Sequence, residues 1–491
     1  MSDARPGPVI AVVGAGIAGL AAAWELATTS DLAPRNGPPT VVVLDADDRA
    51  GGKLASAEFD GRTVDVAADA FLARRPEATE LVEELGISEE LVPVGASGAS
   101  ILARGRLRPM PAGLALGVPT RWWPLARSGL LSPPESFRVV KDLLLPHLSA
   151  GTTGDRSVAD IVAQRLGRPV VERLVDPLIG GINAGGVDEL SAAATFPALI
   201  AASHQPGSLM RALGRLPAPD TEGPVFWSLR DGTASLADRL VERLVEPGAP
   251  GKVSVRTGVS VDDITQLPGS ATAPRRWGLT LSGTESDLVV DGIVLAVPAP
   301  RAAVLLASSA PVAAGILSTI EYASVAVVTM AIPADAIGAR LEGTGFLVPR
   351  TSHIDGRRAL MTGCTYLSRK WPHLAAAGHE LIRVSVGRDG DERYQDLDDA
   401  ETAAAAFSEL ARVLDIAGDP TDARVTRWED AFPQYRVGHL VRVAKIEEAV
   451  SALPGLAVAG AAYRGVGIPA CIASGRSAAR SVLSSLPGMV R

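Results

Sequence analysis

The sequence has few cysteines, few aromatic residues and no long apolar run. Its 491 residues include two cysteines, Cys364 and Cys471, which are too few for a disulfide framework and lack metal-ligand spacing. No stretch reaches the roughly 18 apolar residues that a membrane-spanning helix needs. The N-terminal MSDARPGPVIAVVG lacks the regions of a secretory signal peptide. We therefore expect a soluble cytoplasmic protein without a metal site and with at most peripheral membrane contact.

Positive charge is also scarce, because the formal net charge is −8. A nucleic-acid partner would require a basic face, so none is expected, and any anionic ligand must meet a local cluster of arginines. Apolar residues make up 47% and charged residues 21% of the chain, which is the balance of a globular protein. The length predicts two or three domains.

A glycine-rich turn near the N-terminus carries the first motif. An apolar strand over residues 9–13 precedes GAGIAGL and a helix, and TVVVLD then forms a second buried strand. Gly14 permits the tight turn, Gly16 lets the backbone approach a pyrophosphate, and Gly19 allows close packing of helix on strand. Asp45 ends the second strand and is placed to bind a ribose hydroxyl. This βαβ unit predicts a Rossmann-type dinucleotide site, with a ligand-free glycine turn as the alternative.

The residues after Asp45 favour a flavin over a nicotinamide. In DADDRAGGKL, Arg49 precedes Gly51 and Gly52, so a cation and backbone N–H groups can close over the pyrophosphate. This extended form resembles the amine-oxidase-like flavoproteins. We therefore expect FAD as the cofactor.

A second glycine motif, GVGIPACIASG, lies near the C-terminus. Gly460, Gly465 and Gly467 allow close backbone approach, and Pro469 suits the first turn of a helix. In the flavoprotein superfamily the C-terminal strand returns to the flavin domain, so the positive end of this helix would face the flavin ring. An ordinary C-terminal turn and helix is the alternative. Cys471 is interpreted as a small buried residue, so the FAD is expected to be non-covalent.

Between the two motifs the hydrophobic periodicity changes. It is mainly helical over residues 77–202, and strand-like apolar runs return after residue 225. We expect an α/β fold with a Rossmann-type, amine-oxidase-like FAD-binding domain, an inserted helical domain and a mixed-sheet substrate domain. The expected bounds are 1–76, 225–297 and 438–491 for the FAD-binding domain, 77–202 for the helical domain, and 203–224 and 298–437 for the substrate domain.

Sequence blocks along nearly the whole chain resemble the oxygen-dependent protoporphyrinogen and coproporphyrinogen III oxidases of haem synthesis, in their soluble bacterial branch. The blocks occur in family order: GAGIAGLAAAWEL, DAFLARR, PLIGGINAGGVDELSAAATFP, GTGFLVP, SRKWPH, RWEDAFPQYRVGHL and GVGIPACI. The chain departs from the family at Ala67, where glycine is common, and at Ala470, where aspartate is common.

The resemblance implies a six-electron oxidation of a porphyrinogen by FAD, with dioxygen as oxidant and hydrogen peroxide as by-product. The cofactor carries the chemistry, so no catalytic acid or base is expected. Coproporphyrinogen III is the favoured substrate and protoporphyrinogen IX the alternative. A flavin amine oxidase, a desaturase or a flavin-free escort protein are more distant alternatives. Transient handover of the product to a ferrochelatase is a further expectation.

The resemblance also implies the positions of site residues. The pocket for the macrocycle is expected between Gly181, Ile182 and Asn183 on one face and Phe346 and Leu347 on the other, although core packing explains Ile182 and Leu347 equally well. Arg74 and Arg75 are the first candidates for binding propionates, because guanidinium matches carboxylate in a bidentate way; solvated surface arginines are the alternative. Beyond the residues already named, the expected cofactor site contains Ile17, Ala18, Ala46, Lys53, Val259, Val466 and Ile468.

Overall fold

A five-stranded parallel sheet forms the centre of the nucleotide-binding part. The structure is a computed structural model that describes residues 7–29, 37–144, 154–216, 223–249, 251–269, 275–283 and 286–486. Val, Ile and Leu dominate the sheet, as expected for strands buried on both faces. The strands, in spatial order, are β12 Lys252–Arg256, β2 Thr40–Leu44, β1 Val9–Val13, β16 Gly292–Leu295 and β24 Leu456–Val458.

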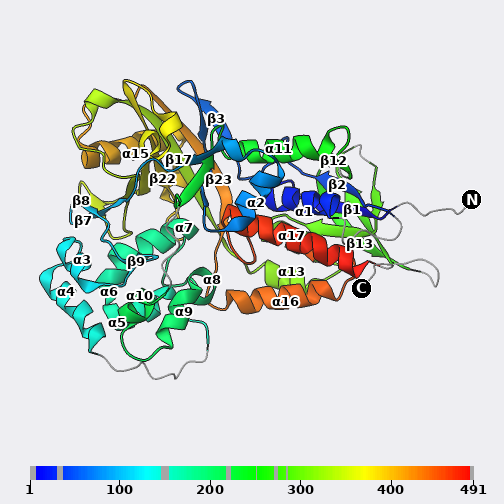
Figure 1. Ribbon diagram of the computed structural model, residues 1–491, viewed down its shortest axis with the longest axis horizontal. Helices are drawn as coiled ribbons and strands as arrows, with labels where there is room; N and C mark the ends of the chain where they lie inside the picture. Colours follow the sequence, from blue (N-terminus) through cyan, green and yellow to red (C-terminus); the bar gives the residue numbers. More distant parts are fainter. Residues whose placement is uncertain are drawn as a thin grey trace, which may run out of the picture.

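Helices and a small sheet cover the two faces of this parallel sheet. One face packs against α1 Ile17–Thr28, α2 Pro76–Glu84, α11 Ala234–Val245 and α17 Ile468–Ser485. The other face packs against α12 Ala299–Leu306, α13 Pro311–Leu317, α16 His439–Ser451 and a sheet of β13 Val261–Leu267, β14 Arg276–Leu281 and β15 Leu288–Val290. The first and last helices, α1 and α17, therefore lie side by side and share one core (Figure 1).

A seven-stranded mixed sheet forms the second part. Helix α15 Asp399–Leu414 covers one face, where Ile382, Val384 and Val386 pack. The alternate residues of the same strand, among them Arg383 and Ser385, belong to the opposite face. The strands, in spatial order, are β23 Asp422–Pro433, β17 Tyr322–Pro333, β22 His379–Val386, β21 Met361–Tyr366, β18 Gly345–Leu347, β7 Ser100–Ala103 and β8 Arg106–Pro109.

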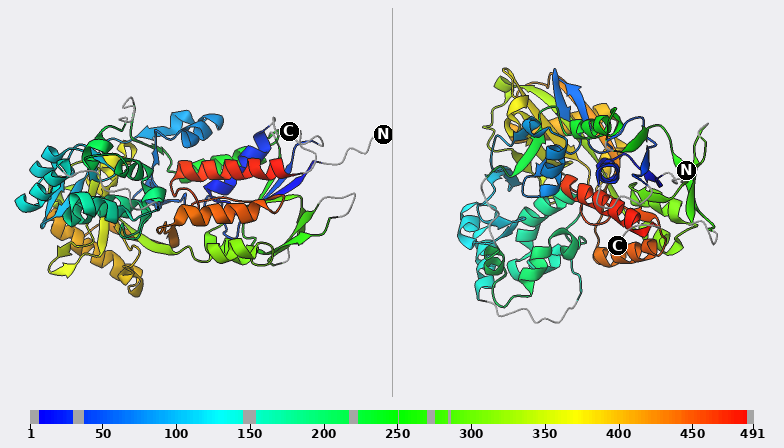
Figure 2. Two further views of the ribbon diagram at one scale, coloured as in Figure 1. Left: turned by 90° about the horizontal axis from the view of Figure 1, so that it is seen from below. Right: turned by 45° about the vertical axis from the view of Figure 1, so that its right-hand side comes forward.

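The third part is mainly helical and lies beside the seven-stranded sheet, away from the parallel sheet (Figure 2). Its most irregular element is the π-helical segment η3 Val171–Gly180, in which Pro177 lacks the N–H that an α-helix would use. The other elements are α3 Trp122–Arg127, α4 Pro133–Val140, α5 Val158–Leu166, α6 Arg168–Val170, α7 Gly181–Asn183, α8 Ala192–Thr195, α9 Pro197–Ser203, α10 Leu209–Gly214, and the hairpin of β9 Leu114–Ala115 and β10 Val118–Pro119.

Short elements connect the three parts. Strands β5 Phe71–Leu72, β11 Phe226–Leu229 and β6 Leu91–Pro93 form one small sheet, and β3 Ser56–Phe59 pairs with β4 Arg62–Asp65. The remaining elements are β19 His353–Ile354, β20 Arg357–Arg358, α14 Leu367–Lys370, η1 Ser88–Glu90, η2 Lys141–Leu143, η4 Ala334–Ala336, η5 Pro372–Leu374 and η6 Arg393–Asp396.

The elements of residues 77–202 divide among all three parts. Helix α2 packs in the core around α1 through Leu81 and Val82, and Leu85, just after the helix, packs there too. Strands β7 and β8 belong to the seven-stranded sheet. Helix α10 continues the helical core beyond residue 202. We therefore propose that the helical domain spans about residues 114–214. Local periodicity identifies a helix but not the surface on which it packs, which is why the sequence alone placed its start at residue 77.

Candidate active site

A cavity of about 680 Å³ lies at the carboxyl edge of the parallel sheet. Residues within three positions of the ends of its strands line the cavity, as is general for ligand sites of doubly wound folds. They are Gly14 after β1, Asp45 after β2, Val259 after β12, Ala296 after β16 and Gly460 after β24.

The glycine turn between β1 and α1 presents backbone to this cavity. Gly14 has φ +101° and donates its N–H to the Leu44 carbonyl at 2.7 Å. A Cβ on Gly19 would lie 1.8 Å from the Gly14 oxygen, so this glycine is required for close packing, as predicted. Gly16 caps α1 without a side-chain cap, and a Cβ there would meet nothing within 4 Å. The N–H groups of the first turn therefore face open space suited to a phosphate.

Asp45 is fixed by the same turn. Its Oδ2 accepts the N–H of Ala15, and its Oδ1 accepts the N–H of Asp47 at 2.9 Å. Burial raises the pKa of this carboxyl, and the two N–H bonds oppose that rise. Each oxygen keeps a free lone pair, so the carboxylate can still accept from a ribose hydroxyl.

Arg49 braces the loop that follows. It donates to the carbonyls of Leu54 at 3.0 Å and Gly52 at 2.6 Å, while also lining the cavity. Gly51 donates its N–H to the Ala15 carbonyl at 2.8 Å, and a Cβ on Gly52 would lie 3.3 Å from Gly16 Cα. The glycine pair thus packs directly on the dinucleotide turn.

The C-terminal motif closes the cavity from the other side. Gly460, with φ +119°, has open space where a Cβ would lie, and its N–H bonds Ser474 Oγ at 3.0 Å. Ile468 and Cys471, at the start of α17, line the cavity. Burial raises the pKa of the Cys471 thiol to about 12, so the thiol stays protonated and is a poor nucleophile. This agrees with a non-covalent cofactor.

Most of the expected cofactor residues line this one cavity. They are Gly14, Gly16, Ile17, Ala18, Asp45, Ala46, Arg49, Gly51, Gly52, Lys53, Val259, Gly460, Val466 and Ile468. Gly19, Gly465, Gly467 and Pro469 are not lining residues; they shape the turns behind it. The open space beside the glycine turn, the Asp45 carboxylate held by two backbone N–H groups, and the N-terminus of α1 fit FAD.

A second cavity of about 380 Å³ adjoins the first. Six residues line both: Lys53, Ala68, Trp428, Ala431, Ala461 and Val466. Burial lowers the pKa of Lys53 at this junction. The walls of the second cavity come from η3 of the helical part, from β17, β22 and β23 of the seven-stranded sheet, and from Ala461 and Val466 between β24 and α17 of the nucleotide-binding part, so all three parts of the molecule contribute to it.

Ion pairs hold the charged side chains of the second cavity. Asp69 lies 2.8 Å from Lys370 Nζ and 3.1 Å from Arg383 Nη2. Burial alone would raise the pKa of Asp69, but Arg383 and Lys370 outweigh burial and hold it well below its usual range. Asp176 lies 3.4 Å from Arg350 Nε, and Arg388 lies close by in the same cavity.

The expected substrate residues are only partly brought to this cavity. Gly181 lines it. Ile182 is 50% exposed, and Asn183 is buried, donating to the Ile179 carbonyl at 2.8 Å. Phe346 is buried in the core under α15, and Leu347 packs on the helical core. The neighbouring Val348 is the residue of this block that lines the cavity.

Arg74 and Arg75 do not line either cavity. Both are exposed, and Arg75 pairs with Glu77 at 2.7 Å. Pro76 begins α2 immediately after them, so the chain turns onto the surface at this point.

Sequence reasoning missed the arginines that do line the cavity: Arg350, Arg383 and Arg388. One signal was present, because ELIRVSVGR alternates apolar and non-apolar residues. This pattern predicts a strand with one polar face. Arg350 lies beyond the short strand β18, where no periodicity marks it.

Comparisons with known proteins agree with this site. The family of flavin containing amine oxidoreductases matches residues 17–483. The chain is 33% identical to coproporphyrinogen III oxidase of Bacillus subtilis (99% of this chain, 100% of the relative) and 36% identical to that of Mycobacterium leprae (95% and 96%). It is 31% identical to protoporphyrinogen oxidase of Bos taurus (98% and 99%).

Solved structures agree as well. A crystal structure from Exiguobacterium sp. 255-15, provisionally named a protoporphyrinogen oxidase, superimposes with a TM-score of 0.83 at 31% identity and covers 97% of this chain and 99% of its own. Cyclohexylamine oxidase of Brevibacterium oxydans shares the fold, with a TM-score of 0.66 at 16% identity over 98% of this chain and 99% of its own. This chain therefore belongs to the flavin-containing amine oxidoreductase family and is an FAD-dependent oxidoreductase, as its glycine turn, its cavities and these matches together indicate.

Proposed function

We propose that this enzyme oxidises coproporphyrinogen III to coproporphyrin III. The relatives named above supply the substrate class, and the basic lining of the second cavity supplies the physical reason. Arg350, Arg383 and Arg388 line a cavity whose other walls are largely apolar. Such a cavity suits an apolar macrocycle with carboxylates at its rim.

The same charges disfavour an amine substrate. An ammonium group would meet three guanidinium groups, and like charges brought together in a partly buried site repel each other strongly. The carboxylates of Asp69 and Asp176 are already paired with arginines. A flavin amine oxidase is therefore the weaker alternative.

FAD, when bound, would supply the redox chemistry by accepting hydride from methylene bridges of the macrocycle and giving the electrons to dioxygen. In total three hydrides and three protons leave the porphyrinogen, and with three dioxygen molecules they give porphyrin and three hydrogen peroxide molecules. The chain's own residues hold the two reactants. Gly14, Gly16, Gly52 and Asp45 bind the cofactor, and the shared residues Trp428 and Val466 meet both cavities.

We assign no acid–base catalyst to the substrate cavity. Among the described residues that line it there is no histidine, cysteine or tyrosine, the carboxylates of Asp69 and Asp176 are paired with arginines, and Lys53 lies at the junction with the flavin cavity. Trp428 is held by its Nε1–H, which donates to the Val66 carbonyl at 2.8 Å. The protein's contribution is therefore orientation of the macrocycle and exclusion of water.

A cytoplasmic location, dioxygen as the oxidant and a transient handover of product to a ferrochelatase are parts of the proposal. Among the described helices, none is both long and apolar enough to cross a bilayer. Peripheral contact with a membrane stays within the proposal.

Side-by-side assays of coproporphyrinogen III and protoporphyrinogen IX test the function. Porphyrin fluorescence gives the rate, and an oxygen electrode gives the stoichiometry. We expect faster turnover of coproporphyrinogen III and about three dioxygen molecules consumed per porphyrin, one for each hydride removed. Faster turnover of protoporphyrinogen IX would reverse the assignment of the substrate, and no oxidation of either would reject the function.

A further inference from the structure

Three arginines of the substrate cavity, Arg350, Arg383 and Arg388, carry buried N–H groups without acceptors within the described residues, and in Arg350 and Arg388 these groups include a terminal nitrogen. Arg350 and Arg388 line this cavity and are not among the residues that it shares with the flavin cavity. Within the part of the chain that the structure describes, Nε and Nη2 of Arg388 and Nη2 of Arg350 are buried and lack a hydrogen-bond partner. A buried cationic donor that has lost water without gaining an acceptor is costly, so these groups are suited to an anionic ligand.

The protein's own carboxylates do not neutralise the pair. Asp391 lies 4.0 Å from Arg388, but Arg393 already binds it with two hydrogen bonds of 2.7 and 2.9 Å. Asp176 lies 3.4 Å from Arg350. Arg350 and Arg388 therefore share Asp176, which leaves an excess of positive charge at this end of the cavity.

Burial does not remove that charge at neutral pH. Burial, with the nearby charge of Arg350, lowers the pKa of Arg388 to about 10, so the guanidinium stays protonated. Burial raises the pKa of Asp176, and Arg350 opposes that rise. Arg388 is 7% exposed, so bulk solvent screens its charge little.

The fold holds the two arginines in place. Gly387, directly after strand β22, has φ +83°, and a Cβ there would lie 2.4 Å from the Tyr394 ring. The turn beyond it is tied to the helical part, because Asp389 donates its N–H to the Ala184 carbonyl at 2.8 Å. Arg350 donates to the Asp389 carbonyl at 2.9 Å, so both arginines are anchored to one turn.

Arg383, in the same cavity, is engaged differently. It donates to the carbonyls of Asp65 at 3.1 Å and Ala67 at 3.3 Å and pairs with Asp69. These bonds join two parts of the molecule and occupy both terminal nitrogens, so among the residues that the structure describes only Nε of Arg383 lacks a partner, whereas Arg388 has a free Nε and a free Nη2. Arg383 therefore has less capacity than Arg388 to bind a ligand.

We propose that Arg350 and Arg388 form a carboxylate-binding subsite that holds one propionate of the macrocycle at the end of the cavity away from the flavin. This inference rests on the proposed function. It gives these two residues the role for which Arg74 and Arg75 were the sequence-based candidates.

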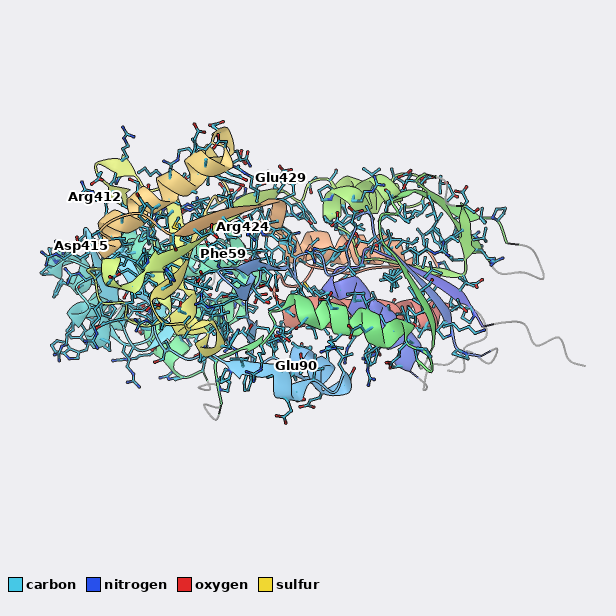
Figure 3. All side chains as sticks on the ribbon, turned by 90° about the horizontal axis from the view of Figure 1, so that it is seen from above. Phe59, Glu90, Arg412, Asp415, Arg424 and Glu429 are labelled. Atoms are coloured by element: carbon cyan, nitrogen blue, oxygen red, sulfur yellow. The ribbon has the colours of Figure 1, made fainter. Side chains whose placement is uncertain are left out.

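The test measures binding of coproporphyrin III and of its tetramethyl ester to flavin-loaded, full-length protein. The two ligands share the macrocycle and differ in whether the four propionates are free carboxylates or neutral methyl esters. The variants are Arg388→Met, Arg388→Lys and Arg350→Met, with Arg412→Met as the matched control. Arg412 lies on α15 at the outer end of the seven-stranded sheet, in an exposed pair with Asp355 (Figure 3).

We expect Arg388→Met to weaken binding of the acid by about tenfold or more, because a charge-assisted hydrogen bond is lost, while the ester binds about as before. Arg388→Lys should retain part of the affinity, and Arg350→Met should resemble Arg388→Met. The control should bind both ligands as the wild type does. Without ligand, Arg388→Met should melt no earlier than the wild type, because it removes an unsatisfied buried charge.

Three results would overturn the inference. The first is unchanged binding of the acid by Arg388→Met and Arg350→Met while the wild type still oxidises coproporphyrinogen III, which would leave the proposed function standing. The second is an equal loss for acid and ester, which would indicate a change of cavity shape. The third is a wild type that neither oxidises coproporphyrinogen III nor binds coproporphyrin III, in which case the proposed function fails as well.

Discussion

His439 is a buried histidine whose environment makes stability depend on pH. Its Nε2 lies 2.8 Å from the Tyr463 carbonyl, and its ring stacks on Tyr435 at 3.9 Å between centroids. Burial lowers the pKa of His439 from 6.5 to about 4. Between these values the unfolded chain binds a proton that the folded chain does not, so stability falls as the pH falls from about 6.5 to about 4.

We expect His439→Gln to flatten the fall in stability over that pH window. The amide can still donate to the Tyr463 carbonyl but does not titrate. The wild type should lose about 3 kcal/mol of unfolding free energy across the window through this residue. Urea unfolding at several pH values measures the difference, and exposed His204→Gln is the control, which should keep the slope of the wild type. An equally steep fall in His439→Gln would contradict the assignment.

At the scale of elements, the crossing of α1 and α17 joins the two glycine motifs. A Cβ on Gly475 would lie 2.0 Å from the Ala18 carbonyl oxygen, so the two helices touch through backbone at this point. Ala18 and Ile468, on these helices, both line the flavin cavity. The separation of the helices therefore sets the shape of the cofactor site.

Gly475→Ala should force α17 away from α1. We expect a loss of about 2 kcal/mol in stability from overpacking, together with reduced flavin content after purification. Gly315→Ala is the matched control, because Gly315 lies in helix α13 with nothing within 4 Å of an added Cβ. This control should gain up to about 1 kcal/mol from helix propensity. Equal behaviour of the two variants in thermal melts would show that the crossing is not tight.

At the scale of the whole molecule, buried and exposed contacts connect the nucleotide-binding part to the seven-stranded sheet. Asp69, which follows the β3–β4 hairpin, binds Lys370 of α14 and Arg383 of β22. Nearby, Arg424 of β23 lies over the Phe59 ring at 5.7 Å and donates to the Glu58 carbonyl at 2.8 Å (Figure 3). The substrate cavity lies between these parts, so its shape depends on their attachment.

Asp69→Asn should leave Lys370 and Arg383 without their shared counter-charge. Removing one partner of a buried ion pair costs about 3 kcal/mol or more, so we expect a markedly lower melting temperature. Asp355→Asn breaks the Arg412 pair, whose side chains are 67% and 57% exposed, and should change stability by about 0.5 kcal/mol or less. Calorimetry of both variants checks this, and a melting temperature of Asp69→Asn equal to that of Asp355→Asn would contradict it.

The sequence by itself determined the cofactor half of the site. Spacing within GAGIAGL and DADDRAGGKL specifies a turn, a helix start and a strand-end carboxylate within about 40 residues, and such local relations follow from backbone geometry. The C-terminal motif was assigned by its glycines and proline. The parallel sheet then brings all of these residues to one edge.

Only the tertiary structure decided which cations line the second cavity. Arg350 and Arg388 come from different turns, and the acid between them, Asp176, comes from a π-helical segment of the helical part. No local pattern relates positions so far apart, because their meeting depends on how three domains pack. Arg74 and Arg75 follow a family-like block, yet they lie exposed just before helix α2 and do not line the cavity.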